Sequence, residues 1–454
     1  MNSATEHEQA QPIEVDLAGR VAEQPWPSRG SAYFALAAII LATMLNFFDA
    51  SVFSLMVERI KVDFRLTDDQ LGWLIGPANI IFYVFVGIPL ARMADIYPRK
   101  WVLAGGITVI STITALGGLA QSFAQLFASR MLIGAGSSAH APGSYSLLSD
   151  LFPPRRLPRA IAWLQLGFIG GTTLGPYIGG RLLGMVSHWR TAHWFGLSIF
   201  GWQWILIMLA APGAIIAILL GLIKEPQRRG VAHVGQAMPI REVMREIMGR
   251  KAIYFPLFFG LALSALETLG MQAWQAPFMI RTYGWTEQQI GSTLAPMLLL
   301  GSIIGLFLGT VLTELLAKKY RDANVRATTL LFSATIPCAV AAPMMPRGEL
   351  ALGCLALAFM FGIAAAIPQN AAIQRITPNE MRGQVTAIYL FMFTFFGAMG
   401  SLLIGSLNQH VFGALWKTLA ISAGVLLPLA AFMIYCGMTP YGREVARLEA
   451  LEKA

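Results

Sequence analysis

The sequence predicts an all-α integral membrane protein in which twelve transmembrane helices form two six-helix bundles. Three observations predict this fold. Of 454 residues, 56% are hydrophobic and only 13% are charged. Many apolar runs are long enough to cross about 30 Å of hydrocarbon, and the two halves of the chain resemble each other. A soluble protein of this length needs more polar residues to cover its surface, which excludes a soluble enzyme.

The apolar runs divide the chain into two sets of six expected helices. The first set lies near residues 32–57, 71–94, 101–120, 124–148, 158–183 and 196–222. The second lies near residues 252–277, 287–313, 325–344, 350–372, 381–407 and 412–437. We therefore expect five parts: a disordered cytoplasmic tail (1–30), an N-terminal bundle (31–223), a cytoplasmic central loop (224–251), a C-terminal bundle (252–437) and a cytoplasmic tail (438–454).

The central loop contains a short amphipathic pattern. Ile240, Val243, Met244 and Ile247 recur at helical spacing, opposite the charged residues at positions 241, 242, 245 and 246. This pattern favours a helix on the inner membrane face, and a solvated linker helix is the alternative.

The basic residues indicate how the chain is oriented. With both termini in the cytoplasm, 24 of the 33 Lys and Arg residues lie on the cytoplasmic side. This excess follows the positive-inside rule. It explains the net charge of +9 by topology, so no nucleic-acid partner is expected. We predict a multi-pass protein of the bacterial inner membrane. The three cysteines lack metal or redox spacing, and no metal or cofactor is expected.

The chain contains an internal repeat. The segment 67–72 matches the segment 286–291 at an offset of 219, and each is a capping box with Thr at the N-cap and Gln three residues later. The same offset carries Asp95, Arg99 and Lys100 onto Glu314, Lys318 and Lys319. Further on, an offset of 225 carries Pro153 onto Pro378, Gly175 onto Gly400 and Gly180 onto Gly405. A duplicated six-helix unit is typical of one class of transporter.

Several motifs resemble signatures of the major facilitator superfamily. Residues 91–100 are similar to its loop 2–3 signature, keeping Asp95, Arg99 and Lys100 and departing at Ala91, Ile96 and Pro98. Arg130, Gly134 and Gly136 resemble its helix 4 signature. The helix 5 signature seen in many antiporters is matched in full by the segment that holds Gly171, Gly175, Pro176, Gly179 and Gly180. Glycines on one face allow close helix packing, and plain packing is the alternative interpretation of this segment.

Within that superfamily, the chain is most similar to bacterial spinster-like transporters over most of residues 40–410. The segments 46–49, 58–61, 149–156 and 377–384 carry this resemblance. Two positions depart from it: Ala50 stands where the branch usually has Arg, and Ser137 where it usually has Glu. The resemblance and these two departures together imply a related scaffold with a different ligand or a different coupling mechanism. Organic anion symporters and drug exporters are the alternative branches to which the chain could belong.

Three acidic or basic residues, Asp49, Arg130 and Glu267, fall away from the ends of their expected spans, where they are costly and mark functional candidates. Asp49 and Arg130 lie at matching depths and are expected to pair, either for function or as a fixed structural pair. Glu267 has no evident basic partner, and an unpaired carboxyl group in a low dielectric tends to keep its proton. We predict Glu267 as the coupling acid; a hydrogen bond to a neighbouring helix is the alternative role.

Amide, aromatic and hydroxyl groups surround these charges. The other residues expected at the substrate site are Asn46, Ser137, His140, Tyr145, Gln272, Trp274, Gln275, Gln369 and Asn370. A packing role remains the alternative for His140. A cytoplasmic gate is expected from Asp95, Arg99, Lys100, Asp150, Glu314, Lys318, Lys319 and Arg375.

These observations predict a secondary active transporter that works by alternating access, as a monomer, on a small organic solute or an amphiphilic lipid. A proton gradient is the expected energy source. A transport-inactive solute sensor on the same fold is the alternative. A membrane enzyme is disfavoured because the chain has no nucleophile elbow, metal-binding spacing or phosphate loop.

Overall fold

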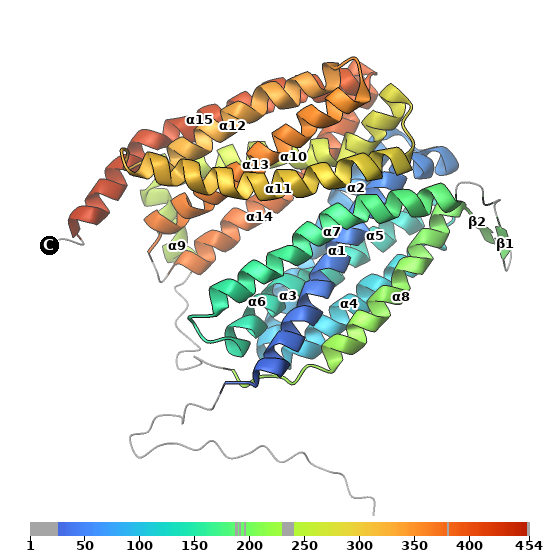
Figure 1. Cartoon of the computed structure of the whole chain (residues 1–454), viewed down its shortest axis with the longest axis horizontal. Helices are drawn as coiled ribbons and strands as arrows, with labels where there is room; N and C mark the ends of the chain where they lie inside the picture. The colour runs from blue at the N-terminus through green and yellow to red at the C-terminus, as the bar shows by residue number, and fades with distance from the viewer. Residues whose placement is uncertain are drawn as a thin grey trace, which may run out of the picture.

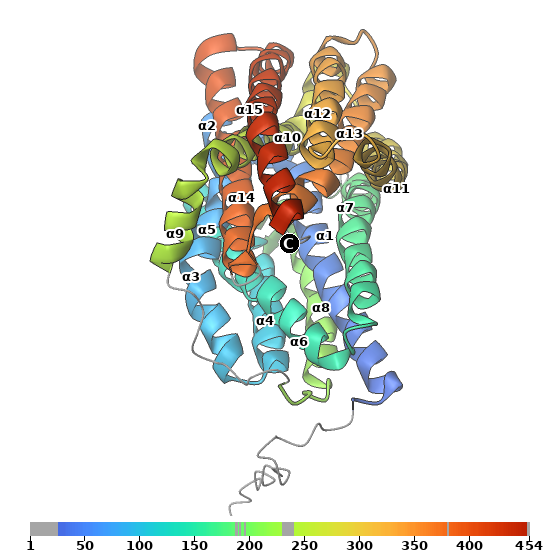
Figure 2. The same cartoon turned by 90° about the vertical axis from the view of Figure 1, so that its left-hand side faces the viewer.

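The computed structural model describes residues 26–186, 189, 192–194, 197–228, 240–378 and 381–451. The expected tail over residues 1–30 lies almost entirely outside these residues. Figure 1 shows two bundles of long helices, one from each half of the chain. Figure 2 shows the C-terminal bundle above the N-terminal one.

The N-terminal bundle contains eight helices in the described residues: α1 Arg29–Phe64, α2 Asp68–Ile75, α3 Pro77–Ile96, α4 Arg99–Gly117, α5 Phe123–Ser138, α6 His140–Leu151, α7 Leu157–Val186 and α8 Gly201–Gly221. Between α7 and α8, β1 (Ala192–Trp194) and β2 (Leu197–Ile199) pair antiparallel. The helix expected from residue 196 therefore begins later, at Gly201, after this short hairpin.

The C-terminal half contains α9 Ile240–Gly249, α10 Lys251–Tyr283, α11 Glu287–Ala317, α12 Ala323–Ala341, α13 Gly348–Ile376, α14 Arg382–Leu407 and α15 Leu415–Leu451. A 3-10 turn, η2 (Ala342–Met344), follows α12, and a π-helical turn, η3 (Asn408–Phe412), follows α14. In α9, Val243 and Ile247 are buried while Met244 and Met248 are exposed.

Ten of the described helical segments are long and apolar enough to span a membrane. The other two segments of the twelve-span fold are the α5–α6 pair, which carries Arg130, His140 and Asp150, and the glycine-rich α7. The break at Ala139 leaves α5 and α6 with 16 and 12 residues, whereas α7 has 30 residues, many of them small or polar. The count of twelve spans in two sets of six agrees with the prediction.

Two expected spans are each broken into two helices. Gly76, between α2 and α3, has a non-helical backbone (φ −108°, ψ −81°) and precedes Pro77. Proline disfavours helical geometry in the residue before it, so the break follows from the sequence. The second break lies at Ala139, between α5 and α6. Here Pro142 cannot donate to the carbonyl group four residues earlier.

The last helix extends beyond the expected bundle. Residues 438–454 were expected to form a tail, but α15 continues to Leu451. Tyr441 and Val445 of this extension are fully buried, so apolar packing against the bundle keeps the segment helical.

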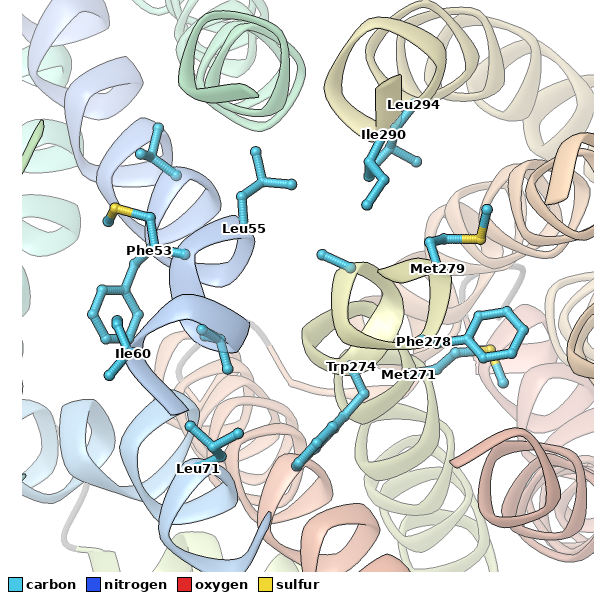
Figure 3. Close-up of a cluster of buried hydrophobic side chains, with 14 of the residues drawn as sticks. Phe53, Leu55, Ile60, Leu71, Met271, Trp274, Phe278, Met279, Ile290 and Leu294 are labelled. Atoms are coloured by element: carbon cyan, nitrogen blue, oxygen red, sulfur yellow. The ribbon is translucent and has the colours of Figure 1, made fainter. Parts of the chain in front are cut away.

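The two ends of the molecule differ in how the bundles meet. We call the end that holds α2 and the hairpin the outer end, and the end that holds α9 and the end of α15 the inner end (Figure 1). At the outer end one apolar cluster joins both halves, with Phe53 and Leu71 from the N-terminal half and Phe278 and Ile290 from the C-terminal half. In Figure 3, Leu55 and Ile290 point into the space between the bundles.

At the inner end each half has an apolar cluster of its own. One cluster contains only C-terminal residues, such as Tyr254 and Tyr441. The other contains only N-terminal residues, such as Leu36 and Leu148. The described residues therefore close the outer end and leave the inner ends of the bundles unjoined.

Candidate functional site

The first cluster of predicted residues lies inside the N-terminal bundle. Arg130 Nη1 donates to Asp49 Oδ2 at 2.9 Å, and Thr114 donates to Asp49 Oδ1 at 3.3 Å. The guanidinium group lies 3.7 Å from the ring centre of Phe53. Asp49 and Arg130 are each 5% exposed, so α1 and α5 bring two opposite charges together where water is scarce.

Two neutral contacts extend this cluster along α1. Ser137 donates to Asn46 Oδ1 at 3.1 Å, and Thr43 Oγ1 lies 2.7 Å from His140 Nε2. Ser137, at the position of a usual Glu, is thus part of a neutral hydrogen bond. Tyr145 is exposed on α6 and belongs to neither contact.

Glu267 borders a cavity of about 40 Å³ inside the C-terminal bundle. The carboxyl group accepts a hydrogen bond from Ser422 at 3.2 Å, and its Oε2 atom has no partner among the described residues. The residue is only 1% exposed. The cavity has room for a few water molecules. It is lined by Glu267, Thr268, Met271, Gln272, Gln275, Leu294, Leu298, Thr335, Ala339, Leu355, Ala356, Ala358, Phe359 and Leu427.

Three residues expected beside Glu267 lie elsewhere. Trp274 is fully buried, and its indole N–H donates to the carbonyl of Ser401 on α14 at 2.8 Å. Gln369 is buried on α13, and Asn370 is exposed and donates to the carbonyl of Ala366. The helical periodicity of α10 explains why Trp274 lies apart from its neighbours: its side chain points toward α14, while those of Gln272 and Gln275 reach the cavity.

A network of charges, which we call the outer clamp, joins the halves at the outer end. Arg281 binds Glu58 and Asp68, with closest atoms 2.9 Å apart in each pair. Asp68 also accepts from Lys61 and Asn408, each at 2.6 Å. Arg59 and Glu287 form a bidentate pair at 2.5 and 3.0 Å. The clamp comprises Glu58, Arg59, Lys61, Asp68, Arg281, Glu287 and Asn408.

The clamp follows the internal repeat, although we did not predict it. Asp68 and Glu287 are 219 residues apart, and each is an acid in the first turn after a capping box. Asp68 binds a base from the C-terminal half, and Glu287 binds a base from the N-terminal half. The two acids are thus equivalent under the repeat, while their basic partners, Arg281 and Arg59, are 222 residues apart and so are shifted by three positions. Equivalent acids at the starts of α2 and α11 are the sequence signal that could have revealed this network.

The expected cytoplasmic gate does not join the halves in this structure. Arg99 is 2% exposed and pairs with Asp150 of its own bundle at 2.5 Å and with Glu225, at the start of the central loop, at 3.0 Å. The Glu225 carboxylate also accepts from the backbone N–H groups of Arg99 and Lys100, which caps α4. This network therefore holds one bundle together.

The C-terminal members of the expected gate behave similarly. Arg375 pairs with Glu449 at 2.7 Å inside its own half. Glu314, Lys318 and Lys319 are exposed near the end of α11. The Asp95 side chain lies outside the described part of the chain. In the described part of the chain, Glu314, Lys318, Lys319 and Arg375 form no ion pair with the N-terminal bundle.

The glycines of α7 lie at two interfaces. A Cβ atom at Gly171, Gly175 or Gly179 would overlap α1. A Cβ at Gly180 would overlap the backbone of Glu287, and one at Gly291 of α11 would overlap the carbonyl oxygen of Pro176. The segment therefore packs α7 against its own bundle and, at its outer end, against the other bundle.

Replacing Gly291 with valine is expected to prevent close contact of α7 and α11 and to shift the protein away from the outer-closed conformation. Cross-linking of cysteines placed at the outer ends of these helices should fall at least several-fold. A Cβ atom at Gly362 would meet no described atom within 4 Å, so Gly362→Val is the matched control. Unchanged cross-linking in Gly291→Val would contradict the packing role.

Known proteins resemble this chain in sequence over most of its length. A family model described as Major Facilitator Superfamily matches residues 39–401. An MFS-type efflux pump of Mycolicibacterium smegmatis is 26% identical over 410 residues, which cover 89% of this chain and 90% of the pump. Protein spinster of Drosophila melanogaster is 22% identical over 404 residues, covering 85% of this chain and 64% of that protein.

Solved structures are similar over nearly the whole chain. A bacterial homologue of the human lysosomal transporter Spinster, in an inward-facing and unoccupied conformation, matches with a TM-score of 0.76 at 22% identity. The match covers 92% of this chain and 98% of the homologue. The fold, with its two bundles, is thus shared.

Proposed function

Since this chain belongs to the Major Facilitator Superfamily and is a membrane transporter, with transporters rather than enzymes as its relatives, we propose that it exports a small amphiphilic solute in exchange for protons. In this proposal Glu267 carries the proton. The protein is a monomer of the bacterial inner membrane, with both termini in the cytoplasm. The efflux pump among its relatives and the antiporter-type segment of α7 support export.

The distribution of contacts supports an inward-open state. The outer clamp and the shared apolar cluster hold the outer end closed, and the inner clusters are separate. With the orientation that the basic residues predict, the unjoined end faces the cytoplasm. A solute would enter there and leave after the bundles rock to open the outer end.

The observation that carries the proton-coupling proposal is the burial of Glu267 beside a small cavity. A charged carboxylate there would have a single hydroxyl partner, and burying such a charge is costly. Loss of the proton should therefore destabilise this inward-open state and favour one in which Glu267 is hydrated. A proton binding step is in this way linked to the rocking of the bundles.

The lining of the cavity supports the solute class. Two amides, Gln272 and Gln275, border it together with apolar side chains such as Phe359 and Leu298. The cavity holds only a few water molecules in this state, and we expect it to widen into a site for a molecule with one polar and one apolar end.

A conformational measurement tests the role of Glu267 without a known solute. Spin labels at positions 97 and 318, in a variant without other cysteines, report the separation of the inner ends by electron–electron double resonance. Raising the pH from 6 to 8 is expected to shorten this separation in the otherwise unchanged protein. Glu267→Gln should keep the long separation at both pH values.

Glu349→Gln is the matched control, because Glu349 is an exposed acid at the start of α13 and is not part of the expected gate. This variant should respond to pH like the unchanged protein. A Glu267→Gln variant that also responds to pH in full would remove Glu267 from the coupling mechanism.

A further inference from the structure

A basic hollow lies at the inner end of the N-terminal bundle, away from the cavity at Glu267. Its volume is about 390 Å³, and it is lined by Arg29, Tyr33, Leu36, Phe152, Arg156, Arg159, Ala160 and Trp163. This size is in the range of ligand pockets. No acidic residue is among these described lining side chains, so the hollow has a strongly positive character.

Two neighbouring helices build the hollow. Positions 29, 33 and 36 lie on one face of α1. Positions 159, 160 and 163 lie in the first two turns of α7, and Arg156 directly precedes that helix. The two helices pack along each other and lie on the near face of the N-terminal bundle in Figure 1. Tyr33 and Phe152 meet edge to face at 5.5 Å and form its wall.

The three arginines are free to bind a ligand. In the part of the chain that the structure describes, Arg29, Arg156 and Arg159 form no ion pair, and all three are exposed. By contrast, Arg99 and Arg375 at the same end each bind an acidic residue. Both α1 and α7 also begin here, so the positive ends of two helix dipoles add to the positive field.

The surroundings of the hollow point to lipid as the source of the anion. Tyr33 and Trp163 are 52% and 55% exposed, and such rings prefer the boundary between headgroups and acyl chains. Farther along the same helices, toward the membrane centre, Leu41 and Leu166 are exposed. A ligand that fills the hollow thus meets charge at one end and an apolar surface at the other.

We propose that this hollow binds the phosphate headgroup of an anionic phospholipid from the leaflet at the inner end. Arginine suits phosphate because its planar fork donates two parallel hydrogen bonds, and basic pockets between membrane helices are suited to lipid headgroups. The bound lipid links the start of α1 to the start of α7, so it would stabilise the inner end of one bundle.

Native mass spectrometry of the full chain in detergent, titrated with palmitoyl-oleoyl phosphatidylglycerol, tests this site. The affinity should fall about fivefold for each arginine removed. Arg29→Gln, on α1, should therefore lower the lipid affinity about fivefold. The double variant Arg156→Gln/Arg159→Gln should lower it more than about tenfold. Arg155→Gln is the matched control, because Arg155 is exposed beside the hollow but does not line it.

Each other outcome decides against the proposal. Equal lipid retention in the double variant and in Arg155→Gln would remove the site. Equal binding of phosphatidylcholine would show that the anionic charge is not recognised. Displacement of the lipid by millimolar inorganic phosphate would identify a free anion, instead of a lipid, as the ligand.

Discussion

Replacing Arg281 with glutamine is expected to open the outer end of the protein and close the inner end. The Arg281 guanidinium group binds Glu58 and Asp68 across the two halves. Removing it leaves two carboxylates, whose side chains are 18% and 6% exposed, without their main partner. Breaking a fully buried ion pair costs about 3–5 kcal/mol. For this partly exposed pair we expect about 2 kcal/mol, or roughly a thirtyfold shift in the ratio of the two conformations.

Distance measurements at both ends of the bundles check this shift. Labels at the inner end should move closer and labels at the outer end farther apart. Arg326→Gln is the matched control, since Arg326 pairs with Asp322 at 2.9 Å within one half. Exchange of the charges in the other cross-bundle pair of the clamp, Arg59→Glu with Glu287→Arg, should preserve closure. An unchanged distance distribution in Arg281→Gln would mean that the outer clamp does not hold this state.

Replacing either member of the Asp49–Arg130 pair is expected to destabilise the protein strongly, whereas replacing both should cost much less. The pair is buried, with 2.9 Å between Arg130 Nη1 and Asp49 Oδ2. A lone charge left in this place costs about 3–5 kcal/mol. Asp49→Asn and Arg130→Met should therefore each lower the unfolding temperature in detergent, and the double variant should recover at least half of the loss.

The same variants separate the structural from the functional role of the pair. Two nitrogen atoms of Arg130, Nε and Nη2, are buried without a hydrogen-bond partner among the described residues. If Arg130 binds solute, the stable double variant should lose transport. A double variant that transports normally would leave the pair as a structural support of α1 and α5. Single variants as stable as the double would contradict the burial argument.

Local patterns in the sequence predicted much of the fold. Both capping boxes are present, with Thr67 paired to Gln70 and Thr286 to Gln289. These motifs depend only on neighbours three residues apart, so a single segment reveals them. The helix breaks at Gly76 and Ala139 were missed, because the apolar runs continue through them. The Pro residues that cause the breaks were available as a signal.

Long-range contacts were harder to predict than segments. Arg281 and Glu58 are 223 residues apart and meet only when the bundles close. The segment 58–61 and the acid at position 68 were noted for resemblance and capping, not as partners. Trp274 was expected at the substrate site because an aromatic residue suits one, but the rotation of α10 places its indole against α14. Which face of an apolar helix contacts a given neighbour depends on tertiary packing. A periodic pattern without charged residues does not specify that packing.

Transport in proteoliposomes tests the proposed proton exchange most directly. A thermal-shift screen at two pH values would first identify a solute that stabilises the purified protein. The protein would then be reconstituted into vesicles that contain the pH-sensitive dye pyranine, and a pH gradient would be applied across their membrane. Solute movement and pyranine fluorescence would be followed together. The account predicts that solute accumulates against its gradient as protons move the opposite way, and that Glu267→Gln binds solute without accumulating it. Accumulation that survives both collapse of the pH gradient and Glu267→Gln would contradict the account, and binding without any flux in the unchanged protein would indicate a solute sensor instead.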